Sequence, residues 1–214
     1  MKKTIRFLVT GLVGAVLTIS CASAPKTKEI SGVSEIIEHK GTAFGVVQPD
    51  WVATVLSTPN QKTLQKALSI DKHIWYALKS GDNLDFVKNW ADQIDARAEI
   101  GASIKQGISD FVVANMQGEA SDVEEVIERY SARASAISVS GLNKETDWWV
   151  LSRTDYMKKN NQDPKYTYIV IYSLDEDLYA KQIKKAFADE NDKFVDDMIE
   201  YLMNYTMFSN SARD

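Results

Sequence analysis

The spacing of apolar and polar residues predicts two short helices and a strand in the region before residue 82. One helix is expected over Trp51–Val55 behind a cap at Asp50, and another over Asn60–Leu68, where leucines recur four residues apart. The segment His73–Leu78 is predicted to be a strand, because it is rich in aromatic and aliphatic residues and is followed by Ser80-Gly81. We therefore place His73 at the edge of a strand.

A helical period begins at Asn83. Apolar residues then recur at steps of three and four as far as Ile108, which predicts one long helix with an apolar face. Small residues on that face would let the helix lie close to a sheet, and Trp90 and Ile94 are expected to be buried against a strand at Tyr166–Tyr172. Beyond Ile108, the sequence up to residue 117 fits a helix or a strand.

Two motifs of the capping-box type mark later helices. Ser121–Glu124 is predicted to start a helix that runs to about Ala136, and Ser173–Glu176 is predicted to start the last helix. A polar loop is expected at Lys158–Pro164. Three strands are predicted from their aliphatic and aromatic residues: Ile137–Val139, Asp147–Leu151 and Tyr166–Tyr172.

Together these elements predict the α+β class, with a small antiparallel sheet of three to four strands packed against long helices. We expect residues 42–214 to form a single domain, in which the 121–136 helix is an insertion and the last helix extends the C-terminus. Residues 21–41 are expected to form a flexible tether, because they begin with small and polar residues and lack periodicity. Within that tether, Val33–Ile37 could form a short ordered element.

The first twenty residues have the pattern of an export signal. Lys2, Lys3 and Arg6 precede an apolar run of 13 residues, Phe7–Ile19, which is too short to cross a bilayer that requires about 20. We therefore predict a signal peptide over residues 1–20, with Cys21 directly after it.

The residues around Cys21 resemble a bacterial lipobox, in which the cysteine is acylated on its thiol and, after cleavage, on its amine. Leu17 lies four residues before the cysteine, but Thr18 occupies the position that usually holds an aliphatic residue. The alternative is an ordinary secretory signal cleaved at Ala22-Ser23-Ala24. Acylation of Cys21 with palmitate or similar chains predicts a stable anchor in the lipid bilayer. Ala22, in place of an aspartate, favours the outer membrane.

Charge and cysteine content narrow the classes of partner. Without the three cations of the signal peptide, the chain has 22 basic and 30 acidic residues, which gives a formal charge near −8. Such a charge would repel phosphate backbones. We therefore expect no nucleic-acid partner. Cys21 is the single cysteine, so no disulfide within the chain can stabilise the fold.

Candidate catalytic groups are sparse. The two histidines are His39, in the predicted tether, and His73, and no Gly-x-Ser-x-Gly motif supplies a serine nucleophile. The run Asp189–Phe194 begins like a calcium loop, but Lys193 and Phe194 occupy the positions of a ligand and of the turn glycine. We expect no catalytic residues, no metal site and no cofactor, and a protein that is not an enzyme.

Five segments share the pattern of one family: Pro49–Val52, Trp75–Leu78 leading into Ser80-Gly81, Ala96–Ile104, Trp148-Trp149 and Tyr166–Ile171. Together they resemble the LPP20-like family of bacterial lipoproteins, over about residues 49–187. The resemblance implies an outer-membrane-anchored α+β domain with a small antiparallel sheet packed on helices, related to a domain of flagellar assembly proteins. It implies no known catalytic residues. The 121–136 helix and the tail beyond Ala188 depart from the family.

The end of the chain is unusually apolar. Eight of the eleven residues from Met198 to Phe208 are apolar or aromatic, and Glu200 carries the only charge. Three arrangements fit: the segment folds back into the core, it frays, or it docks a partner. Tyrosine and methionine are enriched at interfaces. The candidate docking residues are therefore Tyr201, Tyr205, Met207 and Phe208.

Three functions fit these observations. The first, which we favour, is a membrane-anchored lipoprotein of the bacterial cell envelope. It would act as a non-catalytic structural or protein-interaction module that binds another envelope protein, or itself, through the C-terminal helix. The second is a carrier of an apolar ligand in a pocket between helices and sheet. The third is a cell-wall hydrolase that uses paired carboxylates.

Overall fold

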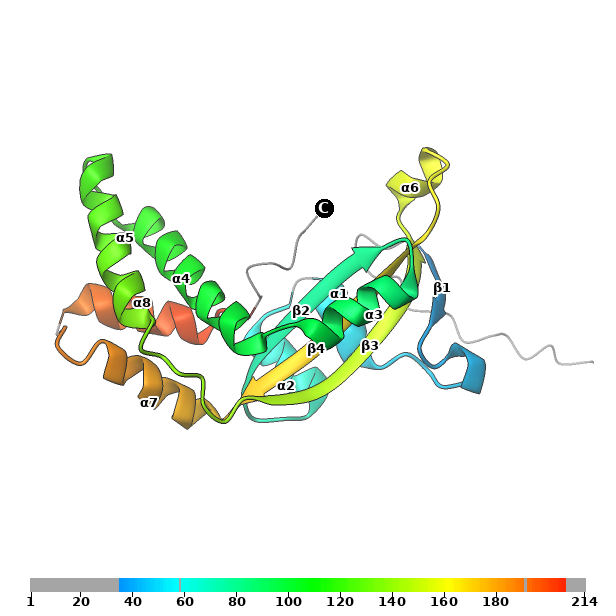
Figure 1. The fold of residues 1–214 in the computed structure, drawn as a ribbon, viewed down its shortest axis with the longest axis horizontal. Helices are drawn as coiled ribbons and strands as arrows, with labels where there is room; N and C mark the ends of the chain where they lie inside the picture. Colours follow the sequence, from blue (N-terminus) through cyan, green and yellow to red (C-terminus); the bar gives the residue numbers. More distant parts are fainter. Residues whose placement is uncertain (1–34, 58, 191, 207–214) are drawn as a thin grey trace, which may run out of the picture.

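A computed structural model describes residues 35–57, 59–190 and 192–206 (Figure 1). The strands are β1 (Glu35–His39), β2 (His73–Gly81), β3 (Asn143–Arg153) and β4 (Lys165–Leu174). The helices are the 3-10 turn η1 (Thr42–Phe44), α1 (Asp50–Leu56), α2 (Gln61–Leu68), α3 (Leu84–Gln93), α4 (Ala96–Asn115), α5 (Ala120–Ala134), α6 (Asp155–Lys159), α7 (Glu176–Ala186) and α8 (Lys193–Met203).

The four strands form one sheet in the order β1-β3-β4-β2, and each neighbouring pair is antiparallel. This confirms the predicted α+β class with a small antiparallel sheet against helices. Bulky residues lie opposite one another across the ladders, with Trp149 opposite Tyr168 and Trp75 opposite Tyr172. Such cross-strand aromatic pairs stabilise a sheet.

The alternation of side chains along the strands divides the core in two. One face of the sheet packs against α1 and α2. The buried residues of that half are Trp51, Val52, Val55, Leu64, Ile74, Tyr76, Val150, Ile169 and Ile171. This part of the fold matches the two short helices expected from the sequence.

The opposite face packs against α3, and its core continues beyond the sheet into a group formed by α4, α5, α7 and α8. Val87 and Ala91 are the buried residues of α3. Buried residues in the helical group include Ile100, Ile104, Ile108, Tyr130, Phe187, Met198 and Leu202. The molecule is therefore elongated, with these four helices at one end and β1, η1 and α6 at the other (Figure 1).

The long helix expected from Asn83 to Ile108 is in fact two helices. Ile94 leaves the helical conformation with ψ near 125°, and Asp95 starts α4 by accepting hydrogen bonds from the N–H groups of Arg97 and Ala98, each at 3.2 Å. Helix α4 then continues to Asn115, which settles the ambiguous segment as helix over most of its length. The apolar stripe continues across the break, so periodicity alone could not reveal it.

The expected burial of Trp90 and Ile94 also needs correction, because α3 ends at Gln93. Trp90 and Ile94 pack against the core but are only half-buried, whereas Val87 and Ala91 take the innermost positions of α3. Helix α3 does lie on β4 and β2, as expected.

Neither predicted capping box starts its helix. Helix α5 follows Glu119 without a side-chain cap. Ser173 lies inside β4, and α7 is capped instead by Asp175, which accepts the N–H of Leu178 at 2.8 Å. The predicted strand Ile137–Val139 is a connection whose Ile137 and Val139 side chains are buried. The apolar composition that predicted a strand thus belongs to a buried loop.

The remaining differences concern the last helix and the polar loop. The single last helix is divided into α7 and α8, and Asp192 caps the second of these. The polar loop at Lys158–Pro164 begins inside α6.

The predicted tether over residues 21–41 is wrong for its last part. Glu35–His39 forms the edge strand β1, with Glu35 opposite Arg153 and His39 opposite Val150 of β3. No residue of β1 is fully buried, so its sequence carries only a weak apolar pattern. The folded domain therefore includes residues from Glu35 onward, earlier than the boundary at 42.

Candidate functional site

The structure describes two of the predicted site residues. Tyr201 lies in the last turn of α8, and Tyr205 follows the end of that helix. Cys21, Met207 and Phe208 lie outside the described residues.

Helix α8 is positioned by its apolar stripe. Asp192 caps it by accepting the N–H of Val195 at 2.8 Å, and Val195, Met198 and Leu202 are buried. Gly107 of α4 lies at the closest approach, since a Cβ there would be 2.9 Å from Leu202 Cδ2. Most of the apolar C-terminal helix is therefore part of the core, as one of the three expected arrangements required.

Tyr201 and Tyr205 lie along the seam between α8 and α4. The Tyr201 ring is 5.6 Å from Phe111 and 6.0 Å from Tyr205, and the Tyr205 hydroxyl donates to Asp110 Oδ2 at 3.3 Å. Burial, together with the Asp110 carboxylate, raises the pKa of Tyr205 to about 12, and the same causes raise the pKa of Tyr201. Both hydroxyls are thus protonated donors at neutral pH. Tyr201 remains 38% exposed.

The residues after α8 return to the outer edge of β2. The carbonyl oxygen of Thr206 accepts the N–H of Tyr76 at 3.0 Å. One step along the same edge, the Gln61 side chain accepts the Ile74 N–H at 3.0 Å and donates to the Ile74 carbonyl at 2.8 Å. A side-chain amide and a C-terminal carbonyl thus occupy backbone hydrogen-bonding positions of this edge strand.

His73 is buried behind this edge rather than exposed at it. Its Nε2 lies 3.0 Å from Gln61 Nε2 and 3.2 Å from the Tyr205 carbonyl oxygen. In the tautomer without a proton on Nε2, this atom accepts a hydrogen bond from Gln61. In the tautomer with a proton on Nε2, it donates one to the Tyr205 carbonyl. Its ring contacts Trp75 and Tyr179. Burial lowers the pKa of His73 to about 3, despite the Tyr205 carbonyl. It is therefore neutral at physiological pH and packed among rings, which suits structure rather than proton transfer.

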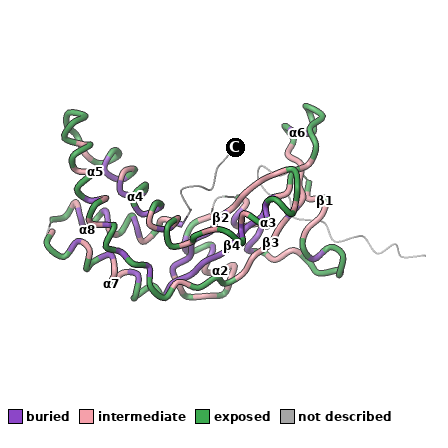
Figure 2. The backbone as a smooth tube through the Cα atoms, viewed as in Figure 1, coloured by how far each residue is buried: buried purple, intermediate pink, exposed green. Residues whose placement is uncertain are grey.

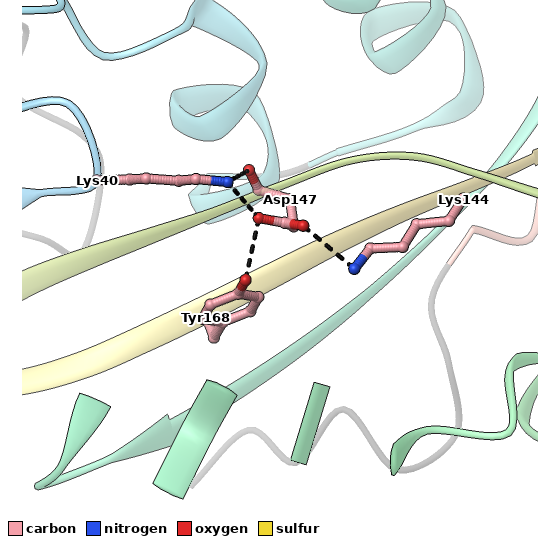
Figure 3. A network of polar contacts seen from close by, with 4 residues as sticks. All are labelled: Lys40, Lys144, Asp147 and Tyr168. Carbon is pink, nitrogen blue, oxygen red and sulfur yellow. Dashed lines mark hydrogen bonds and ion pairs between the residues drawn. The ribbon is translucent and has the colours of Figure 1, made fainter. Parts of the chain in front are cut away.

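A polar cluster on β3 centres on Asp147 (Figure 3). Asp147 Oδ1 accepts from the Tyr168 hydroxyl at 3.0 Å and from Lys40, and its Oδ2 pairs with Lys144 at 3.1 Å. Burial opposes ionisation of Asp147, but these donors outweigh it and hold its pKa below the ordinary value. Burial and the Asp147 bond raise the pKa of Tyr168. Three donors thus converge on one carboxylate, so the cluster is suited to holding Lys40 against β3.

A second surface, which sequence reasoning missed, is the loop Thr42–Val47 after β1. We call it the apolar loop. Phe44 is 84% exposed and Val47 is 78% exposed, and Val46 is also exposed. The run Ala43-Phe44-Gly45-Val46-Val47 lies at the start of the domain expected over residues 42–214, and its apolar composition is the signal in the sequence.

Within the described residues, no group of three or more His, Cys, Asp or Glu side chains is arranged to hold a metal ion. None of the helices in the described ranges is long and apolar enough to cross a membrane.

An open hollow of about 510 Å³ between α7 and α8 is lined by both charged and apolar residues, among them Lys184, Glu190 and Phe187. The tryptophans Trp51 and Trp75 are packed in the two halves of the core.

Comparison with known proteins finds no matching family model, no matching curated protein and no matching solved structure.

Proposed function

We propose that this chain is a lipoprotein of the bacterial outer membrane, anchored through acylated Cys21, that acts as a non-catalytic interaction module. Its partner is another protein of the cell envelope, which docks on the surface around Tyr201 and Tyr205. Met207 and Phe208 follow directly in sequence and belong to the proposal on that ground. The resemblance to LPP20-like lipoproteins supports the anchoring.

The observation that carries this proposal is the held but uncovered ring of Tyr201. The core accounts for Val195, Met198 and Leu202, whereas Tyr201 remains 38% exposed beside Phe111. A ring already held by its neighbours loses little side-chain entropy when a partner covers it. Tyrosines that combine an apolar ring with a hydroxyl donor are enriched at protein interfaces.

Charges around the tyrosines favour a partner of a different sequence over a second copy. Asp110 lies at the Tyr205 hydroxyl, and Glu200 is exposed on α8 next to Tyr201. A second copy docked on the same surface would bring like charges together, which is unfavourable. A protein whose apolar patch is bordered by lysine or arginine would complement this surface.

Site-specific photo-crosslinking in cells tests the docking surface. A photoreactive phenylalanine at position 201 is expected to give one discrete adduct, and the same group at Leu178, which is 37% exposed on α7, serves as the matched control. With the purified partner, Tyr201→Ser should weaken binding at least about tenfold, whereas Leu178→Ser should change it less than about twofold. Binding should also weaken as salt concentration rises.

Two outcomes would contradict the proposal. Equal adducts from positions 201 and 178 would mean that the surface around Tyr201 and Tyr205, the tyrosine surface, has no special role. An adduct with twice the mass of the mature protein would show that the partner is a second copy of this chain.

A further inference from the structure

The apolar loop Thr42–Val47 is built to expose its side chains. Phe44 and Val47 are among the most exposed large hydrophobic residues that the structure describes, and Val46 and Ile37 are exposed nearby. Residues 42–48 contain no charged side chain. Exposed apolar groups gathered in this way mark an interaction site more often than scattered ones do.

The backbone of the apolar loop is closed upon itself. The N–H groups of Phe44 and Val46 donate to the Gly41 carbonyl at 3.1 and 3.0 Å, and the N–H of Gly45 donates to the Thr42 carbonyl at 3.2 Å. Gly45 has a φ of 66°, and Gly41 approaches Val46 so closely that a Cβ there would lie 2.8 Å from the Val46 Cβ. Three successive amides are therefore satisfied inside the loop, which lowers the cost of bringing them to an apolar medium.

The base of the loop is fixed to β3. The Lys40 N–H donates to the Trp149 carbonyl at 3.1 Å, and the Lys40 side chain binds Asp147. The His39 ring lies on Trp148, and the His39 N–H donates to Thr42 Oγ1 at 2.8 Å. The loop is thus held in place as a preformed protrusion.

The position of the loop relates it to the predicted lipid anchor. Glu35 is 14 residues from Cys21, a length of chain that reaches at most about 50 Å, and the loop follows β1 directly. The loop lies at the end of the molecule opposite the helical group, as Figures 1 and 2 show. Helix α6 lies at the same end and presents exposed Tyr156 with Lys158 and Lys159. Tyrosine and lysine are typical of the membrane–water interface.

We propose that the apolar loop inserts into the interface of the bilayer to which the protein is anchored, with Phe44 and Val47 at the boundary between headgroups and acyl chains. A bilayer accepts a small protruding loop without a complementary pocket, whereas a protein partner would need one. The proposal rests on the proposed anchoring through Cys21. It orients the domain, because α6 then lies near the headgroups and the tyrosine surface on α8 points away from the membrane.

Fluorescent labelling of the full-length lipoprotein tests this insertion. Phe44→Cys is labelled with an environment-sensitive probe, with acylated Cys21 unavailable to the label, and the protein is reconstituted into vesicles of phosphatidylethanolamine and phosphatidylglycerol. The matched control is Val113→Cys, at a position that is 63% exposed in the helical group. Nitroxide-labelled lipids are expected to quench the probe at position 44 several-fold more strongly than the probe at 113, and raised salt should not reduce the difference. Equal quenching at the two positions would overturn the insertion.

Two further measurements separate the possible failures. Mass spectrometry of the purified protein reports acylation of Cys21: its absence would overturn the proposed anchoring, whereas acylation without quenching at position 44 would overturn the insertion alone. Pyrene attached at Phe44→Cys reports a second copy, since excimer emission that rises with protein concentration in detergent would show loop-to-loop pairing and overturn the insertion. An unchanged melting temperature of the Phe44→Cys variant is expected, because the ring contributes little to the core.

Discussion

The two ends of this molecule use aromatic residues in opposite ways. In the helical group, rings pack upon one another, with Phe111 at 5.2 Å from Phe194 and Tyr130 at 5.9 Å from Phe187. At the β1 end, Phe44 is 84% exposed on a loop that is shaped by backbone hydrogen bonds. Similar side chains therefore stabilise the fold at one end and are free for contacts at the other. Substitutions should separate these roles.

The largest expected effect comes from truncating a ring in the helical group. Phe187→Ala should destabilise the protein by about 3–5 kcal/mol, because the ring is 2% exposed and its loss leaves a cavity beside Tyr130. Phe44→Ala, the matched control, should change the free energy of unfolding by less than about 0.5 kcal/mol. Urea unfolding followed by circular dichroism measures both. Equal losses would mean that the apolar loop is part of the stabilising core.

Acid should weaken the attachment of the helical group before it weakens the β1 end. The pKa of His73 is about 3 in the fold and 6.5 without it, so below pH 6.5 the unfolded chain binds a proton that the folded chain does not. Stability is then full at pH 7 and falls by about 1.4 kcal/mol for each pH unit between 6.5 and 3. Between pH 7 and pH 5 the loss is about 2 kcal/mol.

The control for this acid effect is His73→Gln, whose stability should change much less over the same range. Urea unfolding at pH 7, 6 and 5 provides the comparison. At the β1 end, Asp147 has a pKa below its usual value, so its contribution persists until the pH falls through the carboxyl range. If the wild-type protein and the variant respond alike, His73 is not the group responsible.

The smallest effect is expected from loosening the base of the apolar loop. Asp147→Asn removes the charge that holds Lys40 and Lys144, at a cost of about 1 kcal/mol, since these contacts are partly exposed. Hydrogen exchange should report the change locally, with faster exchange at the amides of Phe44, Gly45 and Val46. Exchange in α4 should stay as it is. Unchanged loop exchange would show that the backbone turn alone holds the loop.

The sequence predicted the parts of the fold in which local pattern and final environment agree. The strands β2 and β4 and the short helices α1 and α2 followed from composition and spacing. The break between α3 and α4 did not, because the apolar stripe continues in phase through Ile94. The signal that could have found it was Asp95, a residue type that commonly begins helices.

The candidate site was predicted only in part, for a physical reason. An apolar residue on a helix can be buried or can be exposed at its flank, and spacing alone did not separate buried Leu202 from exposed Tyr201. The exposure of Phe44 was likewise invisible, because aliphatic and aromatic runs usually mark the core. Both distinctions depend on which elements pack nearby, and that is decided by residues far away in the sequence.

The edge of β2 has a consequence for a protein that is anchored as proposed. Copies anchored through Cys21 would diffuse in two dimensions, where open strand edges meet often and can pair into aggregates. The Gln61 amide fills both hydrogen-bonding positions of Ile74, and Thr206 takes the N–H of Tyr76, so an approaching strand would first have to displace them. At the opposite edge, β1 carries Glu38, and charged side chains on an edge strand disfavour pairing with another strand. Resistance to aggregation is thus built into both sides of the sheet.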